Sequence, residues 1–599
     1  MYHQAKFTYI KEGRVLDASR IDYNAIVDSW IEQLEQSASD ATQLESLFLS
    51  ESYWRDALAL TWDIQTLCNP AEICDILAPT LKATGATDFK IDQLDNPPAL
   101  VSRVGTDTIE SFFTFQTKTG RNRGIVRLCP DASDGDAYKA WTILTTLEEL
   151  KGFEEKQGAN RPTGKSYSRG FHGPNWLDQR QAANAYADHE PTVVIIGGGQ
   201  AGLATSARLT QLGIDNLIVD KHERIGDNWR NRYHSLTLHN QVKVNHMPYM
   251  PFPLTWPTYI PKDMLANWFE AYVDAMELNY WAGTEVVDGE YDDTAQHWKL
   301  NLKKSDGSTR TLKPRHIVMA TGASGIANIP KIPTIENYKG PIQHSSTYKN
   351  GIQWKGKKVL VFGTGSSGHD IAQDLHSNGA DVTMIQRSST MIVDIEPSAQ
   401  LPYAFYDSGP SVDDCDLIAL SMPVPLARRA HVEFTRQTTE IDKVMLDGLK
   451  KVGFKLDYGD ENTGWQFKYL THGGGYYFNV GCSDLLIEGK VGLLQYDQIE
   501  TFSTNGVTLK DGTSLEADLV VLATGYKPQE AVVEQLFGEN VAERIGPIWG
   551  FGDGLELRNM YCRTNQPGLW FIAGSLAQCR INSKFLGLQI KALDEDLIR

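Results

Sequence analysis

The chain has 599 residues, which is too long for one hydrophobic core and predicts three or four domains. Apolar residues make up 41% and charged residues 22%, as in an ordinary globular protein, while 57 Lys and Arg against 75 Asp and Glu give a net charge of −18. This acidic balance disfavours nucleic acid and membrane surfaces as partners. The absence of a signal-like or spanning apolar run predicts a cytoplasmic protein, and seven scattered cysteines without CxxC spacing predict no metal site.

Residues 1–160 differ from the rest of the chain in their pattern of helix-like and strand-like runs, and are expected to form a small α+β domain. An amphipathic helix over 23–36 and the stretch WRDALALTWDIQT from Trp54 come first. Strand-like runs follow at 109–116, 124–128 and 140–147, with the turn-rich KTGRNR after the first run. Helices followed by a meander favour an α+β unit. A polar stretch interrupted by proline and glycine, residues 161–190, is expected to be a linker.

The stretch 191–220, PTVVIIGGGQAGLATSARLTQLGIDNLIVD, predicts a dinucleotide-binding βαβ unit. An apolar β-branched run is followed by Gly197, Gly199 and Gly202, which satisfy GxGxxG. The first glycine permits the turn, the second admits a pyrophosphate and the third lets helix and strand pack closely. Asp220, 18 positions after Gly202, ends the second strand, where a carboxylate accepts hydrogen bonds from a ribose diol.

The first nucleotide-binding domain is expected to begin with residues 191–353. An aromatic and proline-rich stretch, 223–253, does not have the pattern of a simple helix. A helix around 262–276, a meander around 284–312 and the strand HIVMATG at 316–322 follow. This strand ends in Gly322, a further candidate cofactor contact.

A second βαβ unit is expected over residues 354–387, and its first glycine lies 166 residues after Gly197. Gly363, Gly365 and Gly368 repeat the fingerprint, which predicts a second nucleotide domain over 354–515. Arg387 ends its second strand where the first unit has a carboxylate. A guanidinium there favours the 2′-phosphate of NADP over NAD, although a solvated surface arginine is the alternative. Residues 390–475 are irregular in pattern and are expected to be a substrate-shaping insertion.

The C-terminal part, 516–599, is expected to complete the first nucleotide domain. It contains the apolar strand DLVVLATGY, which carries Thr524 and Gly525, and a tail that has the pattern of a strand, a glycine turn and an amphipathic helix. The predicted fold class is therefore α/β, with two Rossmann-like domains behind a small α+β domain.

From about residue 190 onward, these motifs resemble the class B flavin-dependent monooxygenases, closest to the flavin-containing and YUCCA-type enzymes. Beside the two fingerprints, the resemblance rests on Trp229 in GDNW, the MPFP turn, LATGY, and the stretch from Tyr338 to Tyr348, which is similar to FxGxxxHxxxY. The "WRD…TWD" stretch of the N-terminal domain resembles the nuclear-transport-factor-2-like domains fused to some of these enzymes. Ligand binding, bracing of the enzyme and homodimerisation are the roles that such a domain suggests.

The resemblance implies that NADPH held by the second unit reduces FAD held by the first, and that a C4a-(hydro)peroxyflavin then oxygenates a small organic substrate with O2. It also implies catalytic roles for three residues. His239 or its neighbour Asn240 falls where relatives contact the flavin, although a lone histidine is as often structural. His344 matches the fingerprint histidine, which the resemblance links to domain rotation.

Three reaction types remain open within this family. Baeyer–Villiger relatives carry Trp where this chain has Tyr348, which favours N- or S-oxygenation or YUCCA-like oxidation over lactone formation.

A disulfide reductase is excluded because no cysteine lies between Cys129 and Cys415. A hydrolase is disfavoured because no intact GxSxG occurs. A non-catalytic flavoprotein scaffold or ligand-binding protein is the alternative from another class.

Overall fold

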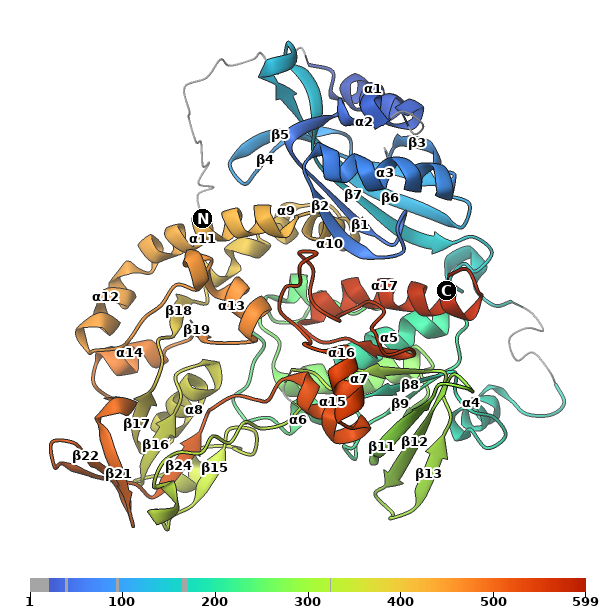
Figure 1. Cartoon of the computed structure of the whole chain (residues 1–599). Coiled ribbons are helices and arrows are strands. Elements are labelled where there is room, and N and C mark those ends of the chain that lie inside the picture. Colours follow the sequence, from blue (N-terminus) through green and yellow to red (C-terminus); the bar gives the residue numbers. More distant parts are fainter. Residues whose placement is uncertain (1–20, 38–40, 93–95, 164–170, 324, 599) are drawn as a thin grey trace.

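The computed structural model describes residues 21–37, 41–92, 96–163, 171–323 and 325–598. The first 20 residues of the expected N-terminal domain and part of the expected linker, 164–170, lie outside these ranges. Figure 1 shows the N-terminal unit above a larger body that contains two separate parallel sheets. In the described part of the chain, no helix is long and apolar enough to cross a membrane.

The N-terminal unit is a seven-stranded sheet with order β2-β1-β7-β6-β5-β3, in which β4 pairs with β5. Three helices pack against it, and Trp30, Leu77 and Phe113 contribute to its core. The stretch from Trp54, grouped with the helices in the sequence analysis, instead forms the antiparallel hairpin of β1 and β2, in which Trp54 pairs with Leu67 and Ala57 with Ile64. The bounds are α1 (Tyr23–Gln36), α2 (Ala41–Glu45), α3 (Pro70–Thr84), β1 (Phe48–Ala57), β2 (Ile64–Cys68), β3 (Thr87–Ile91), β4 (Ala99–Arg103), β5 (Thr106–Gln116), β6 (Gly120–Asp131) and β7 (Ala137–Leu150).

The connection to the first parallel sheet is not a plain linker. It contains α4 (Trp176–Ala185), whose first turn is closed by a capping box between Asn175 and Asp178. The Asn175 side chain accepts from the Asp178 N–H, and the Asp178 carboxylate accepts from the Asn175 N–H. This reciprocal cap stabilises a helix that composition alone did not predict.

The first parallel sheet has order β10-β9-β8-β14-β25. Its central strands are fully buried, because α5 and α17 cover one face and a three-stranded meander and α7 flank the sheet. The tail contributes β25, which pairs with β14, and α17, which packs on α5. The bounds are β8 (Val193–Ile196), β9 (Asn216–Val219), β10 (Tyr280–Trp281), β11 (Thr284–Asp292), β12 (His297–Lys304), β13 (Thr309–Leu312), β14 (His316–Met319), β25 (Leu569–Phe571), α5 (Gln200–Gln211), α6 (Asp227–Arg230), α7 (Lys262–Ala275), α15 (Gln529–Phe537), α16 (Glu539–Ile545) and α17 (Leu576–Asp594).

The second parallel sheet has order β15-β24-β16-β17-β20. Two of its strands correct the expected boundaries: β15 had been expected in the first domain before residue 354, and β24 in its C-terminal part after residue 515. Both join the second sheet because β24 pairs with β15 on one side and β16 on the other. The bounds are β15 (Ile342–His344), β16 (Lys358–Phe362), β17 (Asp381–Gln386), β20 (Gly492–Gln495), β21 (Ile499–Ser503), β22 (Gly506–Leu509), β23 (Ser514–Glu516), β24 (Leu519–Leu522) and α8 (Ser366–Ser377).

The segment 390–475, expected to be irregular, is mostly helical. Its longest helix, α11, has an apolar stripe that is narrow and interrupted by Arg and Thr, which hid the helical period in the sequence. The segment lies between the N-terminal unit and the second sheet (Figure 1). The bounds here are β18 (Met391–Asp394), α9 (Phe405–Ser408), α10 (Val412–Leu420), α11 (Val424–Ile441), α12 (Lys443–Lys451), α13 (Gly464–His472), β19 (Tyr476–Asn479) and α14 (Cys482–Ile487).

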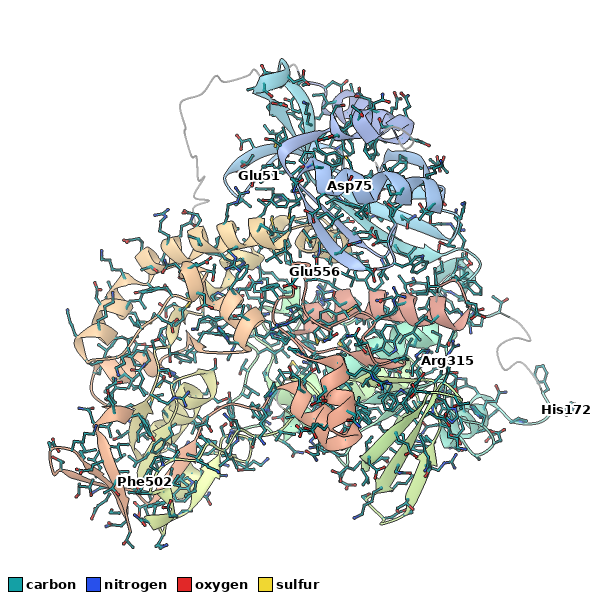
Figure 2. All side chains as sticks on the ribbon, viewed as in Figure 1. Glu51, Asp75, His172, Arg315, Phe502 and Glu556 are labelled. Atoms are coloured by element: carbon teal, nitrogen blue, oxygen red, sulfur yellow. The ribbon has the colours of Figure 1, made fainter. Side chains whose placement is uncertain are left out.

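Polar contacts join the N-terminal unit to this helical segment and to the C-terminal loop. Arg55 forms a two-pronged ion pair with Glu556, and the buried Arg127 donates to the hydroxyl of Ser421 at 2.7 Å. Figure 2 shows Glu556 at this junction. Because these side chains are largely withdrawn from water, the contacts fix the N-terminal unit against the rest of the chain.

Candidate active site

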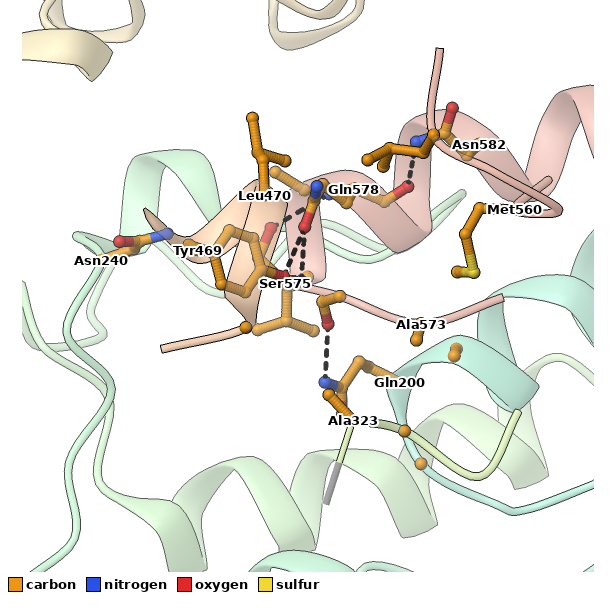
Figure 3. Close-up of a pocket in the computed structure, with 18 of the residues that line it drawn as sticks. Gln200, Asn240, Ala323, Tyr469, Leu470, Met560, Ala573, Ser575, Gln578 and Asn582 are labelled. Carbon is orange, nitrogen blue, oxygen red and sulfur yellow. Dashed lines mark hydrogen bonds between the residues drawn. The ribbon is translucent and has the colours of Figure 1, made fainter. Parts of the chain in front are cut away.

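One large cavity, of about 1430 Å³, lies where the units meet. Its walls come from the N-terminal unit, the first glycine turn, α11, α13, the C-terminal loop and α17. Figure 3 shows part of it, with Gln200 from the first turn facing Ser575 and Gln578 from the tail. The cavity is large enough for a dinucleotide ring system and a small substrate together.

The first glycine turn leaves no room for side chains. A Cβ at Gly202 would lie 2.0 Å from the carbonyl oxygen of Gly197, and one at Gly199 would lie 2.8 Å from Nδ2 of Asn228. Gly197 has a φ of +111°, which L side chains rarely adopt. Gly199 then caps α5 without a side-chain hydrogen bond, so the first N–H groups of the helix point toward the cavity as an anion-binding end.

Asp220 lies at the end of β9 and lines the cavity. One carboxylate oxygen accepts from the Gly198 N–H at 2.6 Å, and the other accepts from the His222 N–H at 2.8 Å and contacts its ring. Burial alone would raise the pKa of Asp220, but these hydrogen bonds hold it below its ordinary value. The carboxylate therefore orders the glycine turn as well as presenting charge to the cavity.

Three buried polar atoms on the cavity wall lack a partner among the described residues: Oδ1 of Asn228 and Oγ1 of Thr321 near the first glycine turn, and Oε1 of Gln466 on α13. Unpaired buried polar atoms are destabilising, so their presence fits a bound group that supplies the missing partners. Nearby, the Trp229 indole donates to the Gln200 side chain, which donates in turn to the Gly574 carbonyl at 3.1 Å. With the glycine cradle, these groups fit a dinucleotide such as FAD.

The second glycine turn repeats this geometry. Gly363 has a φ of +113°, and a Cβ at Gly368 would lie 2.1 Å from its carbonyl oxygen. Gly365 caps α8 without a side-chain bond, as Gly199 caps α5. Ser367 in the first turn of α8 lines the large cavity, so both helix N-termini border the same space.

Arg387 follows β17 at the protein surface and does not line the cavity. Its guanidinium contacts only the hydroxyl of Ser388, at 3.4 Å, and among the described residues no carboxylate pairs with it. An exposed, unpaired guanidinium at the end of this strand fits a phosphate ligand.

His239 and Asn240 both line the cavity. The His239 ring lies edge-on to Phe478, with 5.6 Å between the ring centroids. Asn240 is hydrogen-bonded to Tyr403, whose pKa is raised to about 12 by burial. The sequence analysis therefore selected two neighbours that do face the cavity, beside the aromatic wall of the helical segment.

His344 is buried and lies outside the cavity wall. Its Nδ1 accepts from the Ser346 N–H at 3.1 Å, so Nε2 carries the proton and donates to the Gly525 carbonyl at 3.1 Å. Burial lowers the pKa of His344 below its ordinary value, partly offset by this bond to Gly525. Thr524 donates to the Asn328 carbonyl at 2.6 Å, and Gly322 precedes that same connecting segment. These residues sit where the two connections between the parallel sheets cross.

Tyr348 is also away from the cavity. It is 1% exposed and its hydroxyl donates to Asp374 on α8 at 2.6 Å. The choice of Tyr or Trp at this position therefore acts on the packing of the second sheet in this chain and carries no information about contact with a substrate.

Sequence reasoning missed the residues that tie the helical segment to the glycine turn. The Tyr469 hydroxyl on α13 donates to Gln578 on α17 at 2.7 Å, and Gln578 also accepts from the Ser575 N–H (Figure 3). Both lie in stretches without a recognisable motif, and only the S-x-x-Q capping box at Ser575 offered a signal.

Comparisons with known proteins agree with this geometry. A family model described as pyridine nucleotide-disulphide oxidoreductase matches residues 194–403. The probable indole-3-pyruvate monooxygenase YUCCA10 of Arabidopsis thaliana is 30% identical over 342 residues, which cover 56% of this chain and 82% of that protein. Indole-3-pyruvate monooxygenase YUCCA1 of Oryza sativa subsp. japonica is 29% identical and covers 59% of this chain and 80% of that protein.

Among solved structures, oxidized steroid monooxygenase bound to NADP and cyclohexanone-bound cyclohexanone monooxygenase in the Rotated conformation each align with a TM-score of 0.50 and 17% identity. Each covers 68% of this chain, and 85% and 87% of the respective structures. At this identity the likeness concerns the fold alone.

Fold and site together define an α/β oxidoreductase with two dinucleotide-binding units. The chain belongs to the flavin-dependent monooxygenases. The FAD and NADPH predicted from the two fingerprints are the cofactors of that family.

Proposed function

We propose that this protein uses NADPH, FAD and O2 to insert one oxygen atom into a small organic substrate, with the second oxygen leaving as water. The observation that carries the proposal is the single cavity that reaches both Gly199 at the start of α5 and Ser367 at the start of α8. A hydride passes only between rings in contact, and a shared cavity is what such contact needs. The net reaction consumes one NADPH and one proton per oxygen inserted.

In this proposal the first unit holds FAD and the second holds NADPH, although the sheets share their connecting segments. The residues assigned to FAD are Gly197, Gly199, Gly202, Asp220, Trp229 and Gly322; those assigned to NADPH are Gly363, Gly365, Gly368 and Arg387, with Thr524 and Gly525 at the crossing between the sheets. When bound, the flavin supplies the activation of dioxygen. The cradle at Gly199 and the unpaired atoms of Asn228 and Thr321 support the first assignment.

The chain itself keeps the reacting space dry and orients the partners. His239 and Asn240 present polar groups at an otherwise aromatic wall that includes Phe478 and Trp465. Such groups hold a reacting oxygen by hydrogen bonds while the aromatic wall excludes water. Through its hydrogen bond to the Gly525 carbonyl, His344 holds the two connecting segments of the parallel sheets where they cross. It is therefore assigned as a positioning residue.

We assign the N-terminal unit as a nuclear-transport-factor-2-like domain. Three helices on one side of a sheet that combines long antiparallel strands with one parallel pair support this assignment. In this chain the domain closes one end of the cavity with Arg55, Ile64 and Val104. Shaping the substrate space is therefore its proposed role.

A coupled assay tests the proposal. The purified protein is expected to be yellow and to oxidise NADPH in the presence of O2. It is expected either to add 16 mass units to an amine, thioether or ketone, or to convert a 2-oxo acid into the carboxylic acid one carbon shorter with release of carbon dioxide. A colourless protein that leaves NADPH unchanged would favour the scaffold alternative.

A further inference from the structure

One part of the cavity forms an aromatic chamber around His431. The His431 chamber is defined by cavity-lining side chains of α11, α13 and the C-terminal loop: His431, Phe434, Gln466, Phe467, Leu470 and Phe551. The His431 ring lies 5.5 Å from the rings of both Phe434 and Phe467, and Phe467 lies 5.7 Å from Phe551. Rings at these separations make a continuous apolar wall suited to a flat or cyclic ligand.

Two polar groups interrupt this wall. Neither ring nitrogen of His431, a partly buried residue, forms a hydrogen bond with any described residue, which leaves both open to a ligand in the cavity. Oε1 of Gln466, one turn of α13 away from Leu470, is buried without a partner in the same described set. Burial lowers the pKa of His431 to about 4, so its ring is neutral at physiological pH and offers one donor and one acceptor.

The arginines that line the cavity on the side of the N-terminal unit are already paired with carboxylates, and Arg428, whose guanidinium lies over the Phe467 ring at 5.2 Å, pairs with Glu461 at 3.1 Å. Arg55 donates from Nε and Nη2 to Glu556 and from Nη1 to the Leu420 carbonyl, and Arg103 pairs with Glu110 at 2.6 Å. The other lysine and arginine on the described cavity wall, Lys221 and Arg232, belong to the glycine-turn end. A substrate carboxylate in the chamber would therefore be buried without a free cation, which is strongly unfavourable.

The chamber is connected to the proposed flavin site by contacts of α13. Tyr469 on this helix donates to Gln578, and Gln200 at the first glycine turn donates to the Gly574 carbonyl beside that side chain (Figure 3). A ligand held against Phe467 and Leu470 thus lies next to the helix that borders the glycine turn.

Resting on the proposed function, we propose that the His431 chamber binds an uncharged, ring-bearing substrate whose single polar group hydrogen-bonds to His431, and that it excludes 2-oxo acids. His431 is a specificity-determining residue, and the Arg55–Glu556 pair sets the charge that the chamber accepts.

Two probes of matched shape test the substrate class: phenylacetone, and phenylpyruvate, which has the same ring and carbonyl but carries a carboxylate in place of the methyl group. Binding to the holoenzyme is followed by tryptophan fluorescence, and turnover by product mass. Phenylacetone is expected to bind at least about tenfold more tightly than phenylpyruvate, and His431→Phe to weaken phenylacetone about tenfold, the loss of one hydrogen bond. Equal or stronger binding of phenylpyruvate, or binding of neither probe, overturns the inference.

The charge argument has its own test. Glu556→Gln leaves the Arg55 guanidinium without its carboxylate, so phenylpyruvate affinity is expected to rise about tenfold. The matched control is Glu51→Gln, which breaks the exposed Arg429–Glu51 pair outside the cavity and should change neither affinity. No rise in Glu556→Gln, or an equal rise in the control, contradicts the assigned role of the pair. Flavin content and NADPH oxidation are recorded for each protein, because their loss in the parent would reject the proposed function instead.

Discussion

Nε2 of His344 donates to the carbonyl oxygen of Gly525, 181 positions further along the chain, at 3.1 Å. The bond joins the end of β15 to the turn after β24, where the backbone of Gly525 also accepts from the Asn328 N–H. Tyr526, the next residue, lines the cavity and stacks edge-on against the His344 ring. A histidine outside the cavity therefore sets the position of a tyrosine inside it.

His344→Ala is expected to fold and to bind FAD, because the side chain lies outside the first sheet. Without the bond to Gly525, Tyr526 and the crossing connections lose one constraint, so NADPH oxidation should yield more hydrogen peroxide per product, by roughly twofold to tenfold for a bond of about 1 kcal/mol. The measurement is the ratio of peroxide to oxygenated product. His344→Gln, whose amide can still donate to Gly525, should recover part of the coupling, and the exposed His172→Ala should match the parent. A parent-like ratio in His344→Ala would reduce His344 to a packing residue.

Gly199→Val tests the first nucleotide cradle. Its Cβ would lie 2.8 Å from the Asn228 amide, and its branches would fill the space in front of the α5 N-terminus. The purified variant is expected to retain less than about a tenth of the parent's flavin absorbance, consistent with a penalty of a few kcal/mol for a steric block. Gly554→Val is the control, because no heavy atom lies within 4 Å of its Cβ position and it is outside the cavity. Full flavin occupancy in Gly199→Val would contradict the assignment.

Motifs with strong local physics were predictable from the sequence. The two glycine turns adopt the strained φ values and close contacts that their spacing requires, since only glycine tolerates them at Gly197 and Gly363. The helix Tyr23–Gln36 was also predicted with its bounds, because its apolar stripe is a local signal, and in the structure the Asp22 side chain caps it.

Features that depend on distant contacts were not predictable. No local sequence feature indicates that β24 pairs with β15 and β16, since an apolar strand fits either parallel sheet. The His431 chamber combines side chains from α11, α13 and the C-terminal loop, with 120 positions between His431 and Phe551, and none belongs to a motif. The sequence likewise located His344 without revealing that it lies behind the cavity wall.

The buried Asp56 predicts a pH effect on stability. Burial raises its pKa from 3.8 to about 6, against the opposing hydrogen bonds from Thr145, Thr61 and Leu60. Because the folded pKa exceeds the unfolded one, the folded state binds more protons, and this contribution to stability is present below pH 3.8 and is lost as pH rises through about 6. Between pH 5 and pH 8 the loss is on the order of 1 kcal/mol.

The comparison is between the urea-unfolding midpoints of the parent and Asp56→Asn at these two pH values. The parent is expected to lose stability relative to the variant as pH rises, because the amide does not ionise. Asp63→Asn, at an exposed position in the adjacent turn, should follow the parent. A parent that gains stability relative to Asp56→Asn on raising the pH would show that hydrogen bonding, and not burial, controls this carboxyl.

The last prediction concerns the coenzyme, and it follows from the contrast between Asp220 and Arg387 at the ends of equivalent strands. The Asp220 carboxylate accepts a hydrogen bond from the glycine turn, whereas the Arg387 guanidinium is exposed and has no carboxylate partner among the described residues. A charge-assisted contact with a 2′-phosphate contributes about 1.5 to 3 kcal/mol, which corresponds to roughly ten- to more than a hundredfold preference for NADPH over NADH. Since Arg387 is solvent-exposed, screening places the expected effect at the lower end of that range.

Arg387→Ala should lower kcat/KM for NADPH by about tenfold and leave kcat/KM for NADH nearly unchanged, because NADH lacks the phosphate. Lys451→Ala, another exposed cation, on α12, should keep the parent's ratio. An unchanged ratio in Arg387→Ala would move the phosphate contact to another residue, and a parent that prefers NADH would overturn the coenzyme assignment itself.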